Sequence, residues 1–414
     1  MKAEVITIGD ELLIGQVIDT NSAWIGRELN KIGIELYRIT SVADQEEDML
    51  RILHEAGTRS DLILITGGIG PTKDDKTKHV MSEFFHLPLR FDQKSYDNVE
   101  RIFKARGREV NKLSRTQAMV LDGATIIQNL KGTAPISWIE HKNRIYVSMP
   151  GVPVEMKWAM TEEIIPRILQ KFETDNVIIH RTYLVKDYTE SGLAEHLSEW
   201  EDNLHPDISL AYLPSPGIIR LRMTIRYNNN KDDAEAILDQ EEVRLKELLK
   251  EALFEDNDLP IGAFIGKLLK QKKLTFATAE SCTGGYIAHQ TTAISGSSAY
   301  FKGAVIAYSN EVKENLLRVK SETLLNFGAV SRQVAEEMVL GVKELLKVDA
   351  AVAVTGIAGP DGGTEEKPVG TVWIASYCCG KLISRMYRYG NDREQNIIRT
   401  TNDALLLLAQ LIEN

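Results

Sequence analysis

Thr275-Phe-Ala-Thr-Ala-Glu-Ser-Cys-Thr-Gly-Gly285 is the stretch of this 414-residue chain that points most directly to its fold class. Its first residues predict a short strand, and the small residues that follow predict an abrupt turn into a helix. Ser281 would lie at that turn, beside the N–H groups of Cys282 to Gly285, which a helix start leaves without intrahelical partners. Such a turn is typical of α/β proteins, in which ligands bind beyond the carboxyl ends of the strands.

The chemistry expected at this turn is acyl transfer. Free N–H donors can stabilise an oxyanion, which is usually the largest contribution to such catalysis. A serine nucleophile needs a base, and Lys313 in Tyr308-Ser-Asn-Glu-Val-Lys313 is the better candidate. The positive end of a helix dipole disfavours a charged lysine in the first turn, and only a neutral amine can take a proton. His289 is the nearest histidine in sequence, about two turns into the next helix.

Simpler interpretations of these residues stay open. Ser281 could be only a helix N-cap. Cys282 could be the nucleophile, although a cysteine in such a turn is more often a small buried hydrophobic residue. A single lysine such as Lys313 is most often a solvated surface residue.

The remainder of the C-terminal third continues the α/β pattern. Strands are predicted at 304–308, 350–354 and 369–377, and helices at 334–346 and 394–412. A glycine-rich loop, Gly356-Ile-Ala-Gly-Pro-Asp-Gly-Gly363, follows the second of these strands. Its position predicts a phosphate site with Arg393 as a partner, although Gly-Pro-Asp-Gly alone is an ordinary turn. The glycines expected to bind substrate in this third are Gly284, Gly285, Gly356, Gly359, Gly362 and Gly363.

The N-terminal segment also alternates strands with helices, which predicts a parallel sheet covered on both faces. Strands are expected at 5–8, 35–42, 62–65 and 145–148, and Gly33 stands where a helix C-terminal cap belongs. Unusual polar or glycine-rich residues follow all four strands. They are Gly9-Asp10-Glu11, Asp44, Gly67-Gly-Ile-Gly-Pro-Thr-Lys-Asp-Asp75 and Pro150-Gly-Val-Pro153.

These four strand ends predict a nucleotide or phosphate site. Gly67, Gly68, Gly70 and Thr72 would let backbone N–H groups approach a phosphate closely. Asp74 and Asp75 would repel that phosphate unless a divalent cation such as Mg²⁺ lay between them, with Asp10 and Asp44 as further candidates for the site. The alternative is an ordinary turn followed by helix-capping aspartates.

The composition limits the protein's class and its partners. The net charge of −10 argues against wrapping a nucleic-acid backbone. Three cysteines make no disulfide framework or zinc spacing. Neither a secretory signal nor an apolar run long enough to span a bilayer is visible, so we expect a cytoplasmic protein without a membrane partner.

The alternation of predicted strands and helices changes in the middle of the chain, which indicates a small separate module. Strands are predicted at 177–185, 208–213 and 218–227, and helices at 191–200 and 232–254, with a linker at 256–260. The predicted domains are therefore 1–170, 171–255 and 256–414. The length of the chain agrees with two or three domains.

At this point the sequence resembles a known family. The N-terminal motifs, with Asp19-Thr-Asn-Ser22, look like a molybdopterin-binding-type domain and, more closely, like the CinA (competence/damage-inducible) proteins. The resemblance covers the whole chain, because the middle module and the C-terminal segment occur in the same order in that family. It implies an N-terminal ADP-ribose pyrophosphatase assisted by a divalent metal. Family members commonly read Gly-Thr-Ala-Pro-Gly where this chain has Gly132-Thr-Ala-Pro-Ile136.

The C-terminal motifs look like the nicotinamide mononucleotide deamidase domain. The matching segments are Ala279 to Gly285, Tyr308-Ser-Asn310, Gly356 to Gly363 and Pro368-Val-Gly-Thr-Val372. The resemblance implies hydrolysis of the nicotinamide amide without a metal or cofactor, and adds Thr283 and Tyr308 to the catalytic candidates Ser281 and Lys313. The middle module resembles a KH-type fold but has no Gly-x-x-Gly loop, so nucleic acid is an unlikely partner.

The expected enzyme is a pyridine-nucleotide salvage hydrolase that binds small nucleotides, with a homodimer as the default assembly. Two alternatives stay open. The N-terminal domain could be a molybdopterin-type nucleotidyltransferase, which leaves the C-terminal motif unexplained. The chain could also be a non-enzymatic adaptor in competence or DNA damage, against which the acidic charge and the two glycine-rich sites count.

Overall fold

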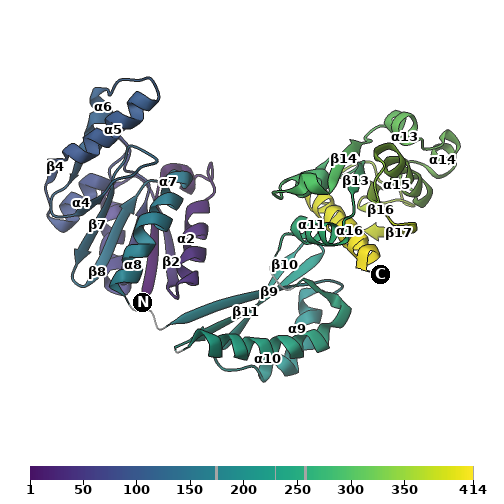
Figure 1. Cartoon of the computed structure of the whole chain (residues 1–414), viewed down its shortest axis with the longest axis horizontal. Helices are drawn as coiled ribbons and strands as arrows, with labels where there is room; N and C mark the ends of the chain where they lie inside the picture. The colour runs from purple at the N-terminus through teal and green to yellow at the C-terminus, as the bar shows by residue number, and fades with distance from the viewer. Residues whose placement is uncertain (173–175, 229, 256–258, 414) are drawn as a thin grey trace. The chain divides into compact units, whose positions relative to one another are not determined.

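The computed structural model describes residues 1–172, 176–228, 230–255 and 259–413 (Figure 1). The chain divides into two compact units, one of Met1–Ile179 with Thr224–Asp239 and the other of His180–Met223 with Gln240–Asn414. Among the described residues, no helix combines the length and the apolar character that crossing a bilayer requires.

The N-terminal domain is built on a six-stranded sheet with the order β2-β1-β3-β8-β7-β6. Neighbours are parallel from β2 to β8, which confirms the predicted parallel sheet, and β7 and β6 extend it as an antiparallel edge that was not predicted. The bounds are β1 Lys2–Ile8, β2 Glu35–Val42, β3 Leu62–Thr66, β6 Thr125–Ile127, β7 Ile136–His141 and β8 Arg144–Met149.

Helices cover both faces of this sheet. Alternate residues of β1 belong to different cores: Val5 packs in a cluster with Ile25 and Met156, and Ile6 in another with Met49 and Val80. Gly33 has φ 73° just past the end of α2, as the predicted cap requires. The helices are α1 Asp10–Leu13, α2 Thr20–Lys31, α3 Glu46–Arg59, α4 Thr77–Phe85, α5 Gln93–Ala105, α6 Lys112–Arg115, α7 Pro153–Trp158 and α8 Ile165–Lys171, with a π-helical turn at Ala159–Ile164 and a small pair of strands, β4 Leu89–Phe91 and β5 Met119–Leu121.

The middle module is a four-stranded sheet, ordered β10-β11-β9-β12, with two helices. The helix predicted over 232–254 is too long, because Lys250 adopts a left-handed φ of 47° and the chain then enters β12, which pairs with β9. Residues 256–258 of the predicted linker lie outside the described residues. The elements are β9 Val177–Val185, α9 Glu190–Asp202, β10 Ile208–Ser215, β11 Ile218–Tyr227, α10 Lys231–Leu249 and β12 Leu253–Glu255.

The C-terminal domain has a five-stranded sheet ordered β14-β13-β15-β16-β17. β13 is parallel to both of its neighbours, while β16 and β17 are antiparallel. The strand predicted at 304–308 ends at Ile306, which leaves Tyr308 in a loop, and β17 was missed by the sequence analysis. The strands are β13 Phe276–Glu280, β14 Phe301–Ile306, β15 Ala350–Gly356, β16 Thr371–Cys378 and β17 Lys381–Arg388.

Two buried clusters again lie on opposite faces of the sheet. Phe276 and Val352 pack with residues of α11 and α16, while Ala277 and Ala351 pack with residues of α15. The helices are α11 Ile261–Lys272, α12 Tyr286–Thr292, α13 Asn310–Leu317, α14 Ser321–Phe327, α15 Arg332–Leu346 and α16 Arg393–Glu413. The carboxyl ends of β13, β14 and β15 therefore meet at one edge, where the predicted C-terminal site residues follow them.

Candidate active sites

The Ser281 turn is fixed by the strands on both sides of it. The Ser281 N–H donates to the carbonyl of Val354 on β15 at 3.1 Å, and the Ala307 N–H, just past β14, donates to the carbonyl of Glu280 at 2.7 Å. Ser281 itself is 9% exposed. The nucleophile candidate thus occupies the junction of three parallel strand ends, at the place that an α/β sheet offers to a ligand.

Lys313 reaches Ser281 from the helix that follows β14. Its Nζ lies 3.1 Å from the Ser281 Oγ and donates to the carbonyl of Ala307 at 2.8 Å. Ser309 caps this helix by accepting from the Val312 N–H at 3.3 Å. Two residues that are 32 positions apart in sequence therefore form a serine–lysine pair.

The environment of Lys313 favours a neutral amine. The side chain is 2% exposed, and this burial lowers its pKa, against a smaller opposing effect of Cys282. The helix dipole was predicted to disfavour the charged form of Lys313, whereas burial is the main cause of the lowered pKa in the structure. A neutral amine in contact with a serine hydroxyl has the protonation state that a general base needs.

The predicted set of free N–H donors is partly wrong. The Gly284 N–H donates to the carbonyl of Ser281 at 3.1 Å, and the Gly285 N–H donates to the carboxylate of Glu280 at 2.9 Å. The Thr283 hydroxyl also donates to Glu280, at 2.8 Å, so this catalytic candidate faces a carboxylate rather than Ser281. Glu280 satisfies these donors, and the sequence analysis gave it no role.

Cys282 is poorly suited to act as the nucleophile in this turn. It is 8% exposed, and burial raises its pKa to about 12. Because the thiolate is the nucleophilic form of cysteine, this thiol is inert near neutral pH. His289 lies on α12 with its ring 6.0 Å from that of Tyr286.

The glycine-rich loop is held by Arg393. One guanidinium nitrogen donates to the carbonyl of Gly359 at 2.7 Å, and another donates to the hydroxyl of Tyr308 at 2.9 Å. Asn396, which was not predicted, donates from Nδ2 to the carbonyl of Ala358 at 3.0 Å. Three sequence-predicted residues from separate segments, Tyr308, Gly359 and Arg393, are therefore in one hydrogen-bonded group. Of the loop's other glycines, Gly356 ends β15, and Gly362 has φ 92°.

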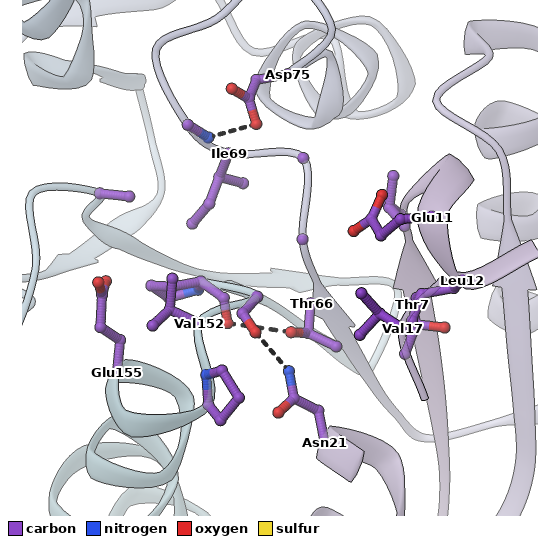
Figure 2. Close-up of a pocket in the computed structure, with 18 of the residues that line it drawn as sticks. Thr7, Glu11, Leu12, Val17, Asn21, Thr66, Ile69, Asp75, Val152 and Glu155 are labelled. Carbon is purple, nitrogen blue, oxygen red and sulfur yellow. Dashed lines mark hydrogen bonds between the residues drawn. The ribbon is translucent and has the colours of Figure 1, made fainter. Parts of the chain in front are cut away.

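The N-terminal domain contains a cavity of about 520 Å³ at the carboxyl ends of its parallel strands (Figure 2). Two hydrogen bonds connect segments that line it. Thr66 Oγ1 donates to the Pro150 carbonyl at 3.1 Å, and Asn21 Nδ2 donates to the Gly151 carbonyl at 2.7 Å. Of the predicted residues, Gly67, Gly68, Gly70 and Asp75 line the cavity, whereas Asp10, Asp44, Thr72 and Asp74 do not.

The lining of this cavity is strongly acidic. Among the described residues that line it, no lysine, arginine or histidine occurs, and the charged ones are Glu11, Asp19, Asp75 and Glu155. Figure 2 shows Glu11 and Glu155 on different sides of the space, with Asp75 beside the glycine loop. A bare pyrophosphate would meet only like charges from these side chains.

The predicted metal residues are occupied with protein donors. Asp75 accepts from the N–H groups of Gly70 (2.7 Å) and Thr72 (2.9 Å) and from the Thr72 hydroxyl, so it braces the glycine loop. Asp10 and Asp44 each accept from the other's backbone N–H, at 3.4 and 3.2 Å.

Two aspartates near this loop have pKa values that are shifted in opposite directions. Burial raises the pKa of Asp44, and neighbouring carboxylates add to this, whereas the hydrogen bond from Thr72 lowers the pKa of Asp74. Within the described ranges, no group of three or more histidine, cysteine, aspartate or glutamate residues is arranged to hold a metal ion. The donor set therefore does not fit a resident metal.

Two further side chains of this domain were not predicted from the sequence. Glu155 accepts from Asn129 Nδ2 at 2.7 Å, and a side chain at Gly132 would collide with its carboxylate. In the segment that departs from the family pattern, Thr133 and Ala134 line the cavity, while Ile136 is buried in β7. Lys78 on α4 is the second: burial lowers its pKa to about 8, and it donates to the Gln117 carbonyl at 3.2 Å.

Comparisons with known proteins cover the whole of this architecture. Family models match residues 4–170 as a probable molybdopterin binding domain, 180–254 as the damage-inducible protein CinA KH domain and 259–412 as the CinA C-terminal domain. A CinA-like protein of Cytophaga hutchinsonii is 41% identical over 408 residues, covering 99% of this chain and 97% of the relative. A putative competence-damage inducible protein of Clostridium beijerinckii is 37% identical over 413 residues, covering 100% of both chains.

Among solved structures, the competence/damage inducible protein CihA of Agrobacterium tumefaciens is 41% identical to the matched part, with a TM-score of 0.36. The match covers 37% of this chain and 94% of that one. The relatives' identity over their full lengths, together with the order of the three matched domains, shows that this chain belongs to the CinA family.

Proposed function

We propose that the C-terminal domain hydrolyses the carboxamide of nicotinamide mononucleotide to the carboxylate and ammonia. The observation that carries this proposal is the Lys313 Nζ, buried and 3.1 Å from the Ser281 Oγ. A serine with a neutral amine as its base is suited to attack on an amide carbonyl. Tyr308, Thr283 and the glycine loops serve as further catalytic or binding residues in this proposal.

The proposed reaction has two halves. The Ser281 Oγ attacks the carboxamide carbon while its proton passes to the Lys313 Nζ. The C–N bond then breaks, and Lys313 returns the proton to the departing nitrogen, which leaves as ammonia. In the second half, a water molecule gives a proton to Lys313 and attacks the acyl-enzyme ester. The ester C–O bond breaks, and the proton returns to the Ser281 oxygen, which releases the carboxylate.

A phosphate group would be bound away from the reacting carbonyl. Arg393 is already oriented by Gly359 and Tyr308, so its guanidinium presents a fixed cation beside the loop of residues 356–363. Guanidinium groups suit phosphate oxygens, and binding energy gained at a remote group can orient the reacting one. This supports a nucleotide over a simple amide as the substrate.

For the N-terminal domain we propose hydrolysis of the pyrophosphate of ADP-ribose, with the substrate arriving as its divalent-metal complex. Support comes from the glycine loop and from a cavity lined by four carboxylates, namely Glu11, Asp19, Asp75 and Glu155. A magnesium–pyrophosphate complex offsets the charge that these side chains would repel. Because the donor set does not fit a resident metal, we derive no catalytic step through one.

A molybdopterin-type nucleotidyltransferase is the alternative for this domain, because residues 4–170 match a probable molybdopterin binding domain. A non-enzymatic competence or damage adaptor is the second alternative, and the similarity to a putative competence-damage inducible protein supports it. A role in pyridine-nucleotide salvage, in the cytoplasm and as a homodimer, belongs to the proposal.

The deciding experiment is ammonia release from nicotinamide mononucleotide by the full chain, compared with Ser281→Ala. We expect the substitution to abolish release and leave AMP formation from ADP-ribose unchanged. Wild-type release by Ser281→Ala would refute the assignment of the nucleophile. The absence of release by the wild-type protein would favour the adaptor or the nucleotidyltransferase.

A further inference from the structure

The feature that the proposed function leaves unexplained is the carboxylate of Glu280, directly before the nucleophile. Glu280 is the last residue of β13 and is 0% exposed. A buried carboxylate is costly unless it is paired or hydrogen-bonded. Neither lysine nor arginine is among its recorded hydrogen-bond partners in the described part of the chain, so its stabilisation comes from neutral donors.

Five neutral donors surround this carboxylate. Oε1 accepts from the Thr278 hydroxyl at 3.0 Å and from the Ala288 N–H at 2.8 Å. Oε2 accepts from the Thr283 hydroxyl at 2.8 Å and from the N–H groups of Gly285 (2.9 Å) and Ile287 (3.1 Å). Backbone N–H groups can only donate and carboxylate oxygens accept, so each of these backbone contacts is a complementary donor–acceptor pair.

The three backbone donors belong to the start of α12. Gly285 is the N-cap of that helix, and Ile287 and Ala288 lie in its first turn. N-terminal N–H groups have no partners within their own helix and usually bind a side chain of the N-cap residue or water. Here the partner comes from the preceding strand, so Glu280 ties the end of β13 to the start of α12 across the turn that contains Ser281.

The same contacts determine which N–H groups remain for a substrate. Glu280 takes those of Gly285, Ile287 and Ala288, and Gly284 donates to the Ser281 carbonyl. Among the described residues, the N–H groups of Cys282 and Thr283, which directly follow the nucleophile, donate to no other residue, and that of Cys282 interacts only with its own thiol. A developing oxyanion on a carbonyl attacked by Ser281 can be stabilised by donors in this position.

We propose that Glu280 is the positioning residue of the Ser281 site. It holds the turn so that the Ser281 hydroxyl faces Lys313 and the N–H groups of Cys282 and Thr283 stay available to the oxyanion. This inference rests on the proposed amide hydrolysis. It predicts that disturbing Glu280 lowers the rate of the chemical step and leaves substrate binding nearly intact, because a small misplacement of reacting groups is costly.

The test uses Glu280→Gln in the full chain, because the amide is nearly isosteric but places an NH₂ group against backbone N–H donors. We expect kcat for ammonia release to fall about 10- to 100-fold, with KM changed less than about 2-fold. A serine-directed fluorophosphonate probe should label Ser281 more slowly by a similar factor. Labelling also counts the competent sites, so a loss of folded protein is separated from a slower step at each site.

Matched variants separate positioning from a general loss of stability. Thr278→Val removes one donor to Glu280 and should lower kcat about 2- to 10-fold, while Thr278→Ser keeps the donor and should restore it. Glu4→Gln is the control, because Glu4 is equally buried but pairs with Arg59 in the N-terminal domain. It should leave the labelling rate of Ser281 unchanged.

Each outcome decides the proposal. An unchanged kcat per labelled site in Glu280→Gln, or a raised KM with normal kcat, overturns it. If Glu280→Gln does not fold, the Thr278 pair decides in the same way. If the wild-type protein releases no ammonia, the proposed function fails while the labelling rates still test the positioning role. A Ser281 that the probe does not label in the wild-type protein refutes the positioning role itself.

Discussion

The two candidate sites of this chain differ in what they bring to a reaction. The N-terminal cavity measures about 520 Å³ and is lined by four carboxylates without a cationic side chain among its described residues. The C-terminal site places a 9% exposed serine against a 2% exposed lysine. The first has room for a large ligand and, in the proposed reaction, takes its substrate with a divalent cation, whereas the second already pairs the two side chains to which the proposed reaction assigns the chemistry. A hydrogen-bonded pair of side chains can therefore be recognised from the structure alone, whereas a role for the acidic cavity has to be tested with the cation present.

Removal of divalent cations should separate the two sites most strongly. With a chelator present, we expect AMP release from ADP-ribose to fall at least about 10³-fold, because the acidic lining then repels the pyrophosphate and the cation's stabilisation of charge is lost. Ammonia release from nicotinamide mononucleotide should change less than 2-fold. Parallel assays on one preparation check this, and equal sensitivity of the two activities to the chelator would contradict a cation requirement confined to the N-terminal site.

Lys313→Met should affect only the C-terminal site. The loss of the base should lower kcat for deamidation about 10²- to 10⁴-fold. Lys78→Met is a matched control, because Lys78 also has a lowered pKa but lies in the N-terminal domain, and it should leave deamidation unaltered.

The pH dependence of the wild-type protein tests the same base. Burial lowers the pKa of Lys313, and the neutral amine is the active form, so kcat/KM should rise as pH rises through that lowered pKa and then level off. It should fall as pH drops below it, because protonation removes the base. A profile of kcat/KM that is flat from acidic to alkaline pH would argue against Lys313 as the base.

Asp75→Asn should give a smaller effect, confined to the N-terminal site. The amide keeps the size of the side chain but replaces one of the oxygens that accept from Gly70 and Thr72, so the loop should loosen. We expect pyrophosphatase activity to fall about 10- to 100-fold, because the loop loses hydrogen bonds to a charged acceptor. Deamidation measured on the same sample serves as the control, and a parallel loss of both activities would indicate unfolding instead.

Arg393→Ala should have an effect of similar size, and Tyr308→Phe the smallest, in both cases mainly on KM. Loss of the guanidinium removes a charged phosphate partner and should raise KM for nicotinamide mononucleotide about 10- to 100-fold. Tyr308→Phe removes only the hydroxyl that orients Arg393 and should raise KM about 2- to 10-fold. A substrate without the phosphate should show no such difference between wild-type and Arg393→Ala. A lower kcat with unchanged KM would contradict a binding role.

The success of the sequence analysis follows from topology. Ser281 and Lys313 follow the strands β13 and β14, which are adjacent and parallel, so a correct α/β reading already placed them at one edge of the sheet. The same reasoning brought the glycine loop after β15 to that edge. In the N-terminal domain it identified the glycine loop and Asp75, which do line the cavity.

The residues and the strand that were not predicted correctly from the sequence also have a physical explanation. Glu280 was overlooked because a charged residue at the end of a strand usually points to solvent, and only the three-dimensional placement of α12 supplies its donors. The edge strand β17 carries exposed lysine and arginine residues, which conceal the alternation that marks a strand. Asp10 and Asp44 were expected in the binding site, but they cap each other's backbone instead. Each case depends on where side chains point, and spacing along the chain does not determine that.

The buried thiol beside Ser281 has a practical consequence for chemical labelling. Cys282 and Cys378 are both buried with pKa values raised to about 12, whereas Cys379 is exposed on the turn between β16 and β17. Maleimide or iodoacetamide reagents should therefore attach to Cys379 in the folded protein and spare the thiol in the Ser281 turn. The sequence thus offers one exposed thiol for attaching a fluorophore or for surface immobilisation without an engineered cysteine.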